Sequence, residues 1–238
     1  MNKNTLDHVL ARLGAEHIMS NKLLNLLLDK AMRGRAWDLV TLARVIGRPL
    51  GPRVEEHIVA QNDPVLSYHY ALCSERPFPL GEPAIAKDPS VAIDYARDVL
   101  HGPFPAGEEA MATRGGIAIT YAMDVLRGPF PLGERAIAEK KQWSLKYAQV
   151  LQGPFPLGEP AIAQDASYAL DYARLLGKPF PLGEKAIAGY ASYSLSYALS
   201  VLHGPFPAGE PAILTSSYKM RYLEFVARCK AQQGVLGA

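Results

Sequence analysis

The sequence predicts an all-α protein, an α-solenoid of about eight short helix-pair repeats with divergent caps at both ends. A Pro-Phe-Pro corner recurs six times, with its first proline at positions 77, 103, 129, 154, 179 and 205. The intervals are therefore only 25 or 26 residues long. Each interval also contains one stretch with the apolar spacing of a helix, and none contains a strand-like alternation. Repetition at such a regular period is the signature of a repeat architecture.

The N-terminal part of the chain is expected to form a cap. TLDHVLARLGAEHIMSNKLLNLLLDKAM has helical apolar spacing but lacks the corner, and the overlapping stretch LLLDKAMRGRAWDLVTLARVIG is a degenerate repeat. We assign residues 1–48 to the N-terminal helical cap and degenerate repeat and residues 49–213 to helical repeats. Residues 214–238 are assigned to a C-terminal capping helix and tail. All three parts belong to one continuous domain in this interpretation.

One repeat unit, PFPLGEPAIAQDASYALDYARLLGK, runs from Pro154 to Lys178. Its second half places Ala169, Tyr172, Ala173 and Leu176 at i, i+3, i+4 and i+7, which predicts a helix with a buried stripe. A glycine follows most of these helices, where a left-handed C′ residue is favoured, and the next proline prevents the helix from continuing.

The corner begins the next unit. Its phenylalanine, Phe155 in this unit, is the only large apolar group in the Pro-Phe-Pro link, so we expect it to fill the gap between neighbouring units. The following glycine suits an N-cap, and Glu159 lies in the first turn, where the helix dipole favours an anion. The first helix should be short, about one to two turns, and partly 3₁₀.

The C-terminal stretch SSYKMRYLEFVARCKAQQ predicts a longer basic helix. Ser216 or Ser217 is the expected cap. The tail GVLGA is expected to fray.

The pattern PFPxGE-x-AIA…YA-x-x-VL-x-G resembles helical repeats of bacteriophage proteins, in forms such as GRFPEGE…AYxYAxxVL. The resemblance covers roughly Pro77 to Lys230. It implies a phage origin and a helical-repeat fold, and it carries no catalytic residues. This chain has Gly-Pro-Phe-Pro where the resemblance leads us to expect Gly-Arg-Phe-Pro, which removes a row of arginines that would favour nucleic acid.

Charge and composition exclude several classes of protein. The formal net charge is +2, with 49% hydrophobic residues. Residues 1–48 carry +4 and residues 214–238 carry +3, so the middle carries −5 and repels phosphate. Cys73 and Cys229 show neither a disulfide framework nor a metal-ligand spacing. The apolar run LLNLLL is too short to cross a membrane. We expect no secretory signal peptide and a location in the host cytoplasm or the virion.

Two residue types recur once per unit. The glutamates are Glu82, Glu108, Glu134, Glu159, Glu184 and Glu210. They form either an acidic row for a basic partner or, as we favour, helix-start carboxylates bound to backbone N–H groups.

The recurring tyrosines are Tyr70, Tyr95, Tyr121, Tyr147, Tyr172, Tyr197 and Tyr222. They form either a stacking surface for bases or, as we favour, core residues whose hydroxyls reach a neighbouring backbone. Four other tyrosines, Tyr168, Tyr190, Tyr193 and Tyr218, are interpreted as non-periodic surface residues.

Two positions beside each recurring tyrosine vary from unit to unit. The residue before the tyrosine and the second residue after it supply the candidate partner-binding residues, which are Asp94, Arg97, Lys146, Gln149, Asp171, Arg174 and Arg221. A constant core with a variable surface is how repeat proteins obtain specific binding faces, although drift of solvated positions explains the same variation.

No nucleotide-binding, hydrolase or metalloprotease motif is present. We therefore expect a non-catalytic interaction scaffold, with no cofactor and no metal, that binds a phage structural protein or a host protein. A homo-oligomer is compatible with this expectation, whereas nucleic acid and membrane partners are not expected. The alternative is a sequestering protein that holds a small nucleotide or signalling ligand, with a dimer seam as one place for it.

Overall fold

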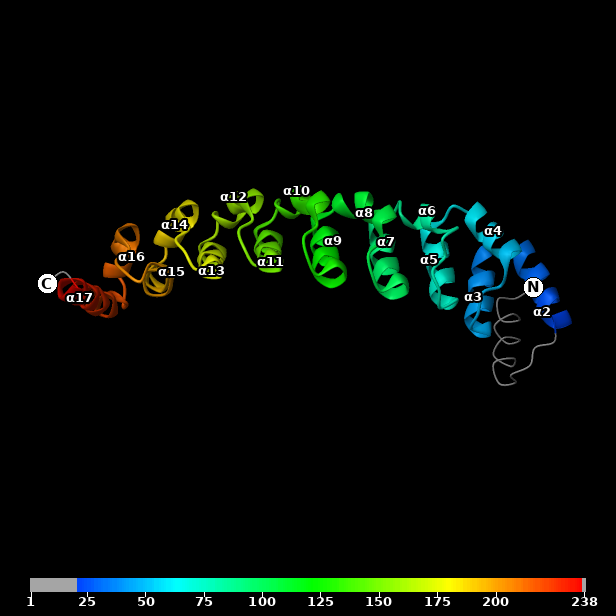
Figure 1. Ribbon diagram of the computed structural model, residues 1–238, viewed down its shortest axis with the longest axis horizontal. Coiled ribbons are helices and arrows are strands. Elements are labelled where there is room, and N and C mark those ends of the chain that lie inside the picture. Colours follow the sequence, from blue (N-terminus) through cyan, green and yellow to red (C-terminus); the bar gives the residue numbers. More distant parts are fainter. Residues whose placement is uncertain (1–20, 237–238) are drawn as a thin grey trace. The chain divides into compact units, whose positions relative to one another are not determined.

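The computed structural model describes residues 21–236 of the chain (Figure 1). Every regular element in this range is helical, so the all-α prediction is confirmed there. The chain divides into two compact units, Met1–Thr113 and Arg114–Ala238.

The described part of the first unit contains seven α-helices and one π-helical turn. They are α2 (Asn21–Arg33), α3 (Ala36–Ile46), α4 (Pro52–Ala60), α5 (Pro64–Cys73), α6 (Glu82–Ile85), α7 (Pro89–Tyr95), the π-turn η1 (Ala96–Leu100) and α8 (Pro105–Ala112). Within this unit α3 packs on α5 and α5 packs on α7. The short helices α4, α6 and α8 lie along one side of these longer helices (Figure 1).

The second unit repeats one arrangement. Its elements are α9 (Gly115–Thr120), η2 (Tyr121–Leu126), η3 (Pro131–Gly133), α10 (Glu134–Ile137), α11 (Lys141–Leu151), η4 (Pro156–Gly158), α12 (Glu159–Ile162), α13 (Ala166–Leu176), α14 (Pro181–Ala188), α15 (Ala191–Tyr197), η5 (Ala198–Leu202), η6 (Pro207–Gly209), α16 (Glu210–Leu214) and α17 (Lys219–Leu236). The longer helices α9, α11, α13 and α15 pack in chain order, each on the next. The short helices α10, α12, α14 and α16 lie along one side of them (Figure 1).

The short first helix of each repeat is confirmed. It is either a 3₁₀ turn that continues into one α-helical turn, as in η4 and α12, or two turns of α-helix, as in α14. Proline at the first helical position has a φ angle suited to a helix. The N–H at that position would have no partner within the helix, so its absence in proline loses no hydrogen bond. Asp88 and Asp165 then cap the second helix, since each side chain accepts hydrogen bonds from the two N–H groups that follow the first helical residue.

The one-residue difference between 25- and 26-residue repeats is absorbed by a π-turn. In the longer repeats the turns η1, η2 and η5 follow the recurring tyrosine, and the N–H of Gly102, for example, bonds to the carbonyl of Ala96, six residues earlier, at 3.0 Å. In the shorter repeats the equivalent bond spans five residues, as from Gly153 to Ala148 at 3.2 Å. A single-residue insertion in a helix commonly appears as such a turn.

The left-handed residue at the end of these helices lies one position earlier than predicted. Glu75, His101, Arg127, Gln152 and His203 have φ near 50°, and only in one repeat does a glycine, Gly177, occupy this position. The glycines that directly precede a Pro-Phe-Pro corner, Gly102, Gly128, Gly153 and Gly204, do not have positive φ. Steric contact with the proline ring forces the residue before it into an extended conformation, so the left-handed residue must precede that one.

Two expectations at the chain ends have different outcomes. The N-terminal helix is observed as α2 from Asn21, and its earlier part lies outside the described residues. The C-terminal helix α17 includes Gly234, Val235 and Leu236 of the tail, whereas Gly237 and Ala238 lie outside the described residues, so the expected fraying stays a prediction. Ser216 accepts a hydrogen bond from the N–H of Tyr218, in the turn before α17 begins at Lys219, so it caps that turn and not the first residues of α17.

Candidate functional site

The constant residues of the repeat form one hydrogen-bonded unit inside the protein. We use "ladder tyrosine" for the seven recurring tyrosines, and "corner phenylalanine", "corner glycine" and "corner glutamate" for the recurring residues of the PFPxGE corner. All seven ladder tyrosines are at most 1% exposed, and the corner phenylalanines are at most 4% exposed. The prediction that these residues lie in the core is therefore confirmed.

The ladder tyrosines Tyr95, Tyr147, Tyr172 and Tyr197 each link the corner before their helix to the corner after it. In the second unit the hydroxyl of Tyr172 accepts a hydrogen bond from the N–H of Phe155 at 2.8 Å and donates one to Glu159 at 2.8 Å. Its ring meets Phe180 of the following corner edge-on, with the ring centroids 4.9 Å apart. Four further tyrosines, Tyr95, Tyr147, Tyr197 and Tyr222, bond to their own corners in the same way.

This geometry corrects the expected role of the glutamates. A pairing of the carboxylate with helix-start N–H groups was predicted, but Glu82, Glu134, Glu159, Glu184 and Glu210 each accept a hydrogen bond from a tyrosine hydroxyl instead. These carboxylates are thus engaged by the protein itself, which argues against a free acidic row. The sequence signal for this pairing is the spacing of 13 residues between Glu159 and Tyr172, which most repeats share.

Burial and hydrogen bonding also shift the acidity of the tyrosines. Burial raises the pKa of Tyr147 and Tyr172 to about 12, the N–H of the corner phenylalanine opposes this shift, and the corner glutamate adds to it. These tyrosines therefore stay neutral at physiological pH and keep the O–H that bonds to the carboxylate.

The corner glycine is required because the surrounding space is too small for a side chain, and not because of its backbone angles. Gly158 has φ −89°, which any residue can adopt. A Cβ at this position would lie 2.5 Å from both the Phe155 ring and the Cβ of Ser144. The absence of a side chain thus lets the corner approach the preceding helix, where the facing residue is always small, either Ser or Ala. The N-cap role expected for this glycine is not what selects it.

The predicted partner-binding residues lie outside this core. Arg97, Lys146, Gln149, Asp171, Arg174 and Arg221 are exposed, and Asp94 is half-buried. Asp94 and Arg97 belong to the first unit, where Arg97 binds Asp94 at 2.9 Å and Asp98 at 2.8 Å. The other five belong to the second unit.

Two of these residues in the second unit contact each other or a neighbouring helix. Arg174 lies 3.6 Å from Asp171 on the same helix and donates a hydrogen bond to Ser200 of η5 at 3.1 Å. The side chain of Arg174 thus reaches from α13 to the helix that follows it.

A second aromatic column was missed. Trp143, Tyr168, Tyr193 and Tyr218 follow each other at intervals of 25 residues, each four residues before a ladder tyrosine. The interpretation of these tyrosines as non-periodic is wrong except for Tyr190, which contacts Tyr193 edge-on at 5.6 Å.

Two rings of the aromatic column each have a lysine over one face. Lys140 lies 4.5 Å from the centroid of Trp143, and Lys141 lies 5.3 Å from that of Tyr168. The Trp143 ring also fills the space above Gly115, where a Cβ would approach it to 2.6 Å. Bases stack on uncovered ring faces, and at Trp143 and Tyr168 a lysine already covers one of the two faces.

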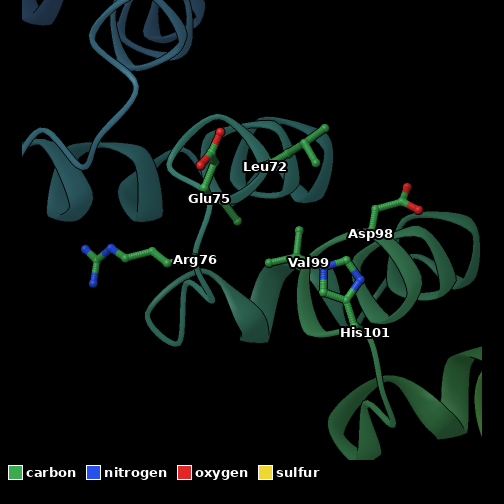
Figure 2. Close-up of a pocket in the computed structure, with 7 residues that line it drawn as sticks. Leu72, Glu75, Arg76, Asp98, Val99 and His101 are labelled. Carbon is green, nitrogen blue, oxygen red and sulfur yellow. The ribbon is translucent and has the colours of Figure 1, made fainter.

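An open hollow in the first unit lies between the end of α5 and η1 (Figure 2). Glu75 and Arg76 come from the end of α5, and Asp98 and His101 come from η1 and its end. Figure 2 shows Arg76 extending away from Asp98, and its guanidinium pairs with Glu55.

Two charged groups of this hollow, Arg76 and Asp98, already have partners. Asp98 accepts hydrogen bonds from Tyr68 at 2.9 Å and from Arg97 at 2.8 Å, and the bond from Arg97 lowers the pKa of its carboxyl. The hollow therefore lacks convergent unpaired charges that would hold a small anion.

Within residues 21–236, no group of three or more His, Cys, Asp or Glu side chains is arranged to hold a metal ion. No helix in the same part of the chain is long and apolar enough to cross a membrane.

Comparisons with known proteins give no match: no family model, no curated protein and no solved structure matches this chain.

Proposed function

We propose that the chain is a non-catalytic interaction scaffold, an α-solenoid of about eight helix pairs that binds a protein partner through its variable helix faces. The observation that carries the proposal is the separation between constant and variable positions. In the repeats, the side chains that stay constant are those of the buried tyrosine and of the corners. The residue before the ladder tyrosine and the second residue after it are exposed or half-buried and differ from repeat to repeat.

The rigidity of the corners supports this proposal. The ladder tyrosine holds two consecutive corners through hydrogen bonds and a ring contact, so neighbouring helices keep a fixed spacing. A partner that contacts several repeats then meets side chains in a preset arrangement, which lowers the entropy lost on binding. The mixed charges of Lys146, Asp171 and Arg174 favour a polar protein surface as the partner.

The charge of −5 carried by the middle of the chain favours a protein over a nucleic acid as the partner. The resemblance to bacteriophage helical repeats extends the proposal to a phage-encoded protein whose partner is a virion component or a host factor. A ligand-sequestering role is less well supported, because Arg76 and Asp98 of the hollow in Figure 2 bond to neighbouring side chains.

The test is affinity capture from infected cells with three forms of the chain, followed by mass spectrometry of proteins and small molecules. One form is unaltered, and a second carries Lys146→Ala, Asp171→Ala and Arg174→Ala. The control form carries Gln164→Ala, Lys178→Ala and Lys185→Ala, which alter exposed residues away from the variable columns.

A protein that is retained by the unaltered and control forms and lost by the second form would support the proposal. Recovery of a nucleotide without any protein would overturn it in favour of sequestration. A protein that is retained equally by all three forms would show that these variable positions of the second unit do not form the binding face.

A further inference from the structure

The last helix, α17, exposes two large apolar side chains. Met220 is 65% exposed and Leu223 is 43% exposed, although the helix buries Tyr222 between them on its opposite side. Met220 lies two residues before the ladder tyrosine, and Leu223 lies one residue after it.

The same two positions are buried in the preceding repeats. The residues two before the ladder tyrosine are at most 9% exposed, and they are Ile93, Ile119, Leu145, Leu170 and Leu195. The residues one after it are fully buried, and they are Ala96, Ala122, Ala148, Ala173 and Ala198. In those repeats this face of the helix packs against the following repeat. In α17 no other residue of the described range 21–236 covers the same face, and its apolar side chains are larger.

Another repeat of the same kind does not fit on this face. The corner glycines Gly133, Gly158, Gly183 and Gly209 face a Ser or Ala that lies three residues before the ladder tyrosine, and a Cβ on the glycine would approach that residue to between 2.5 and 2.7 Å. In α17 this position is Lys219. Its long side chain occupies the space that a corner needs, so the occupant has to be a helix without a PFPxGE corner.

We propose that the face of α17 formed by Met220, Leu223 and Ala227 binds the same face of α17 in a second copy of this chain. The occupant has to offer an apolar helix surface that tolerates a lysine at its edge, and α17 itself has these properties. A two-fold pairing buries Met220 and Leu223 of both copies at once. Lys230 ends the apolar strip, so the interface is small and the dimer weak.

The charges beside this strip favour a parallel pair of helices. On a helical projection, Lys219 and Glu224 lie about 70° to either side of the centre of the strip. In a parallel two-fold pair the Lys219 side of one helix meets the Glu224 side of the other, which gives two ion pairs that flank the apolar contact. In an antiparallel pair the Lys219 side of one helix meets the Lys219 side of the other, and the two Glu224 sides also meet, so like charges face each other.

Sedimentation velocity of the full chain over a concentration series up to high micromolar tests the interface. The unaltered chain is expected to shift from monomer to dimer as concentration rises. Met220→Glu with Leu223→Glu is expected to remain monomeric. The control pair, Leu157→Glu with Leu182→Glu, alters leucines that are 59% and 56% exposed at the corners and is expected to dimerise like the unaltered chain.

Thermal melts by circular dichroism establish that the variants are folded, since all four substituted side chains are largely exposed. A chain that stays monomeric at every concentration would overturn the proposal. The proposal would also be overturned if the variant with Met220→Glu and Leu223→Glu dimerised as well as the unaltered chain.

Charge reversal tests the parallel arrangement. Lys219→Glu alone and Glu224→Lys alone each replace two attractive contacts with repulsive ones, so each is expected to weaken dimerisation by roughly fivefold. The double variant restores opposite charges across the interface and is expected to recover the original dissociation constant. A double variant that is as weak as the two single changes combined would rule out the parallel pairing.

Discussion

The N–H of Phe155 donates a hydrogen bond to the hydroxyl of Tyr172, 17 residues later in the chain, at 2.8 Å. This bond joins the backbone of a corner to the helix that follows it, and the hydroxyl in turn donates a hydrogen bond to Glu159 at 2.8 Å. Both the N–H of Phe155 and the ring of Tyr172 are buried, so water cannot replace the bond. The recurring tyrosine is therefore a polar connector as well as an apolar core residue.

Replacing Tyr172 with Phe should lower the free energy of unfolding by about 1–3 kcal/mol, because it leaves a buried N–H without an acceptor. Urea denaturation measures the change. The matched control is Tyr190→Phe, because Tyr190 is 60% exposed and its loss of a hydroxyl should be nearly neutral. Equal effects of the two substitutions would contradict the proposed role of the bond.

The tyrosines should make the protein sensitive to alkali. The pKa of Tyr147 and of Tyr172 is about 12 in the folded protein, compared with an ordinary value of 10.0. Below pH 10 both folded and unfolded tyrosines are neutral, and the stabilisation is fully present. As the pH rises from about 10 to about 12, the unfolded state ionises first, so the free energy of unfolding should fall across that window.

Denaturant titrations at several alkaline pH values measure this fall, and Tyr172→Phe should show a shallower one. A free energy of unfolding that is constant between pH 10 and 12 would show that the folded tyrosines ionise as easily as unfolded ones.

Replacing Gly158 with Ala should destabilise the protein by about 1–3 kcal/mol, because the added Cβ overlaps Phe155 and Ser144. Gly153→Ala is the control in the same corner. A Cβ at Gly153 meets nothing closer than the Leu151 carbonyl at 3.7 Å, so this change should be neutral or slightly stabilising. Thermal and urea unfolding of both variants distinguish a steric requirement from a general need for glycine in the corner.

Much of this fold can be predicted from the sequence because its signals are local. Proline and the apolar stripe determine where helices stop and start, and the repeat itself shows which positions are equivalent. The bond between Glu159 and Tyr172 could not be derived in the same way. It depends on the angle at which one helix returns past the previous corner, and that angle results from the absence of a Cβ at Gly158.

Other features were recoverable from the sequence but were misinterpreted. A glycine before the Pro-Phe-Pro corner suggests a left-handed residue at that position, although the following proline disfavours that conformation there. The column of Trp143, Tyr168, Tyr193 and Tyr218 has a strict 25-residue period. It was overlooked because a tryptophan begins it.

Replacing Gln152 with Gly should stabilise the protein by about 1 kcal/mol. Gln152 is exposed and has φ 50°, a left-handed conformation that is strained for a residue with a Cβ. Gln149→Gly, three residues earlier inside α11, should instead destabilise by about 0.5–1 kcal/mol, because glycine is unfavourable within a helix. The denaturation midpoint should therefore shift upward for Gln152→Gly and downward for Gln149→Gly. A lower midpoint for both variants would refute the strain at Gln152.

Deleting Asp124 should leave the repeat intact, because it removes the extra residue that the π-turn η2 accommodates. Asp124 is exposed, and its deletion turns YAMDVLRGPF into YAMVLRGPF, which has the length of YAQVLQGPF in α11. The edge-on contact between Tyr121 and Phe130 has a centroid distance of 5.1 Å with the extra residue, and that between Tyr147 and Phe155 has 4.8 Å without it. The free energy of unfolding should therefore change by less than about 1 kcal/mol.

Deletion of Gln149 should lower the free energy of unfolding by more than about 2 kcal/mol, because α11 has no extra residue to release and the ring of Tyr147 could no longer reach Phe155. If the two deletions destabilised the protein equally, the extra residue in the π-turn would not be dispensable, and the 26-residue repeats would need that residue for packing.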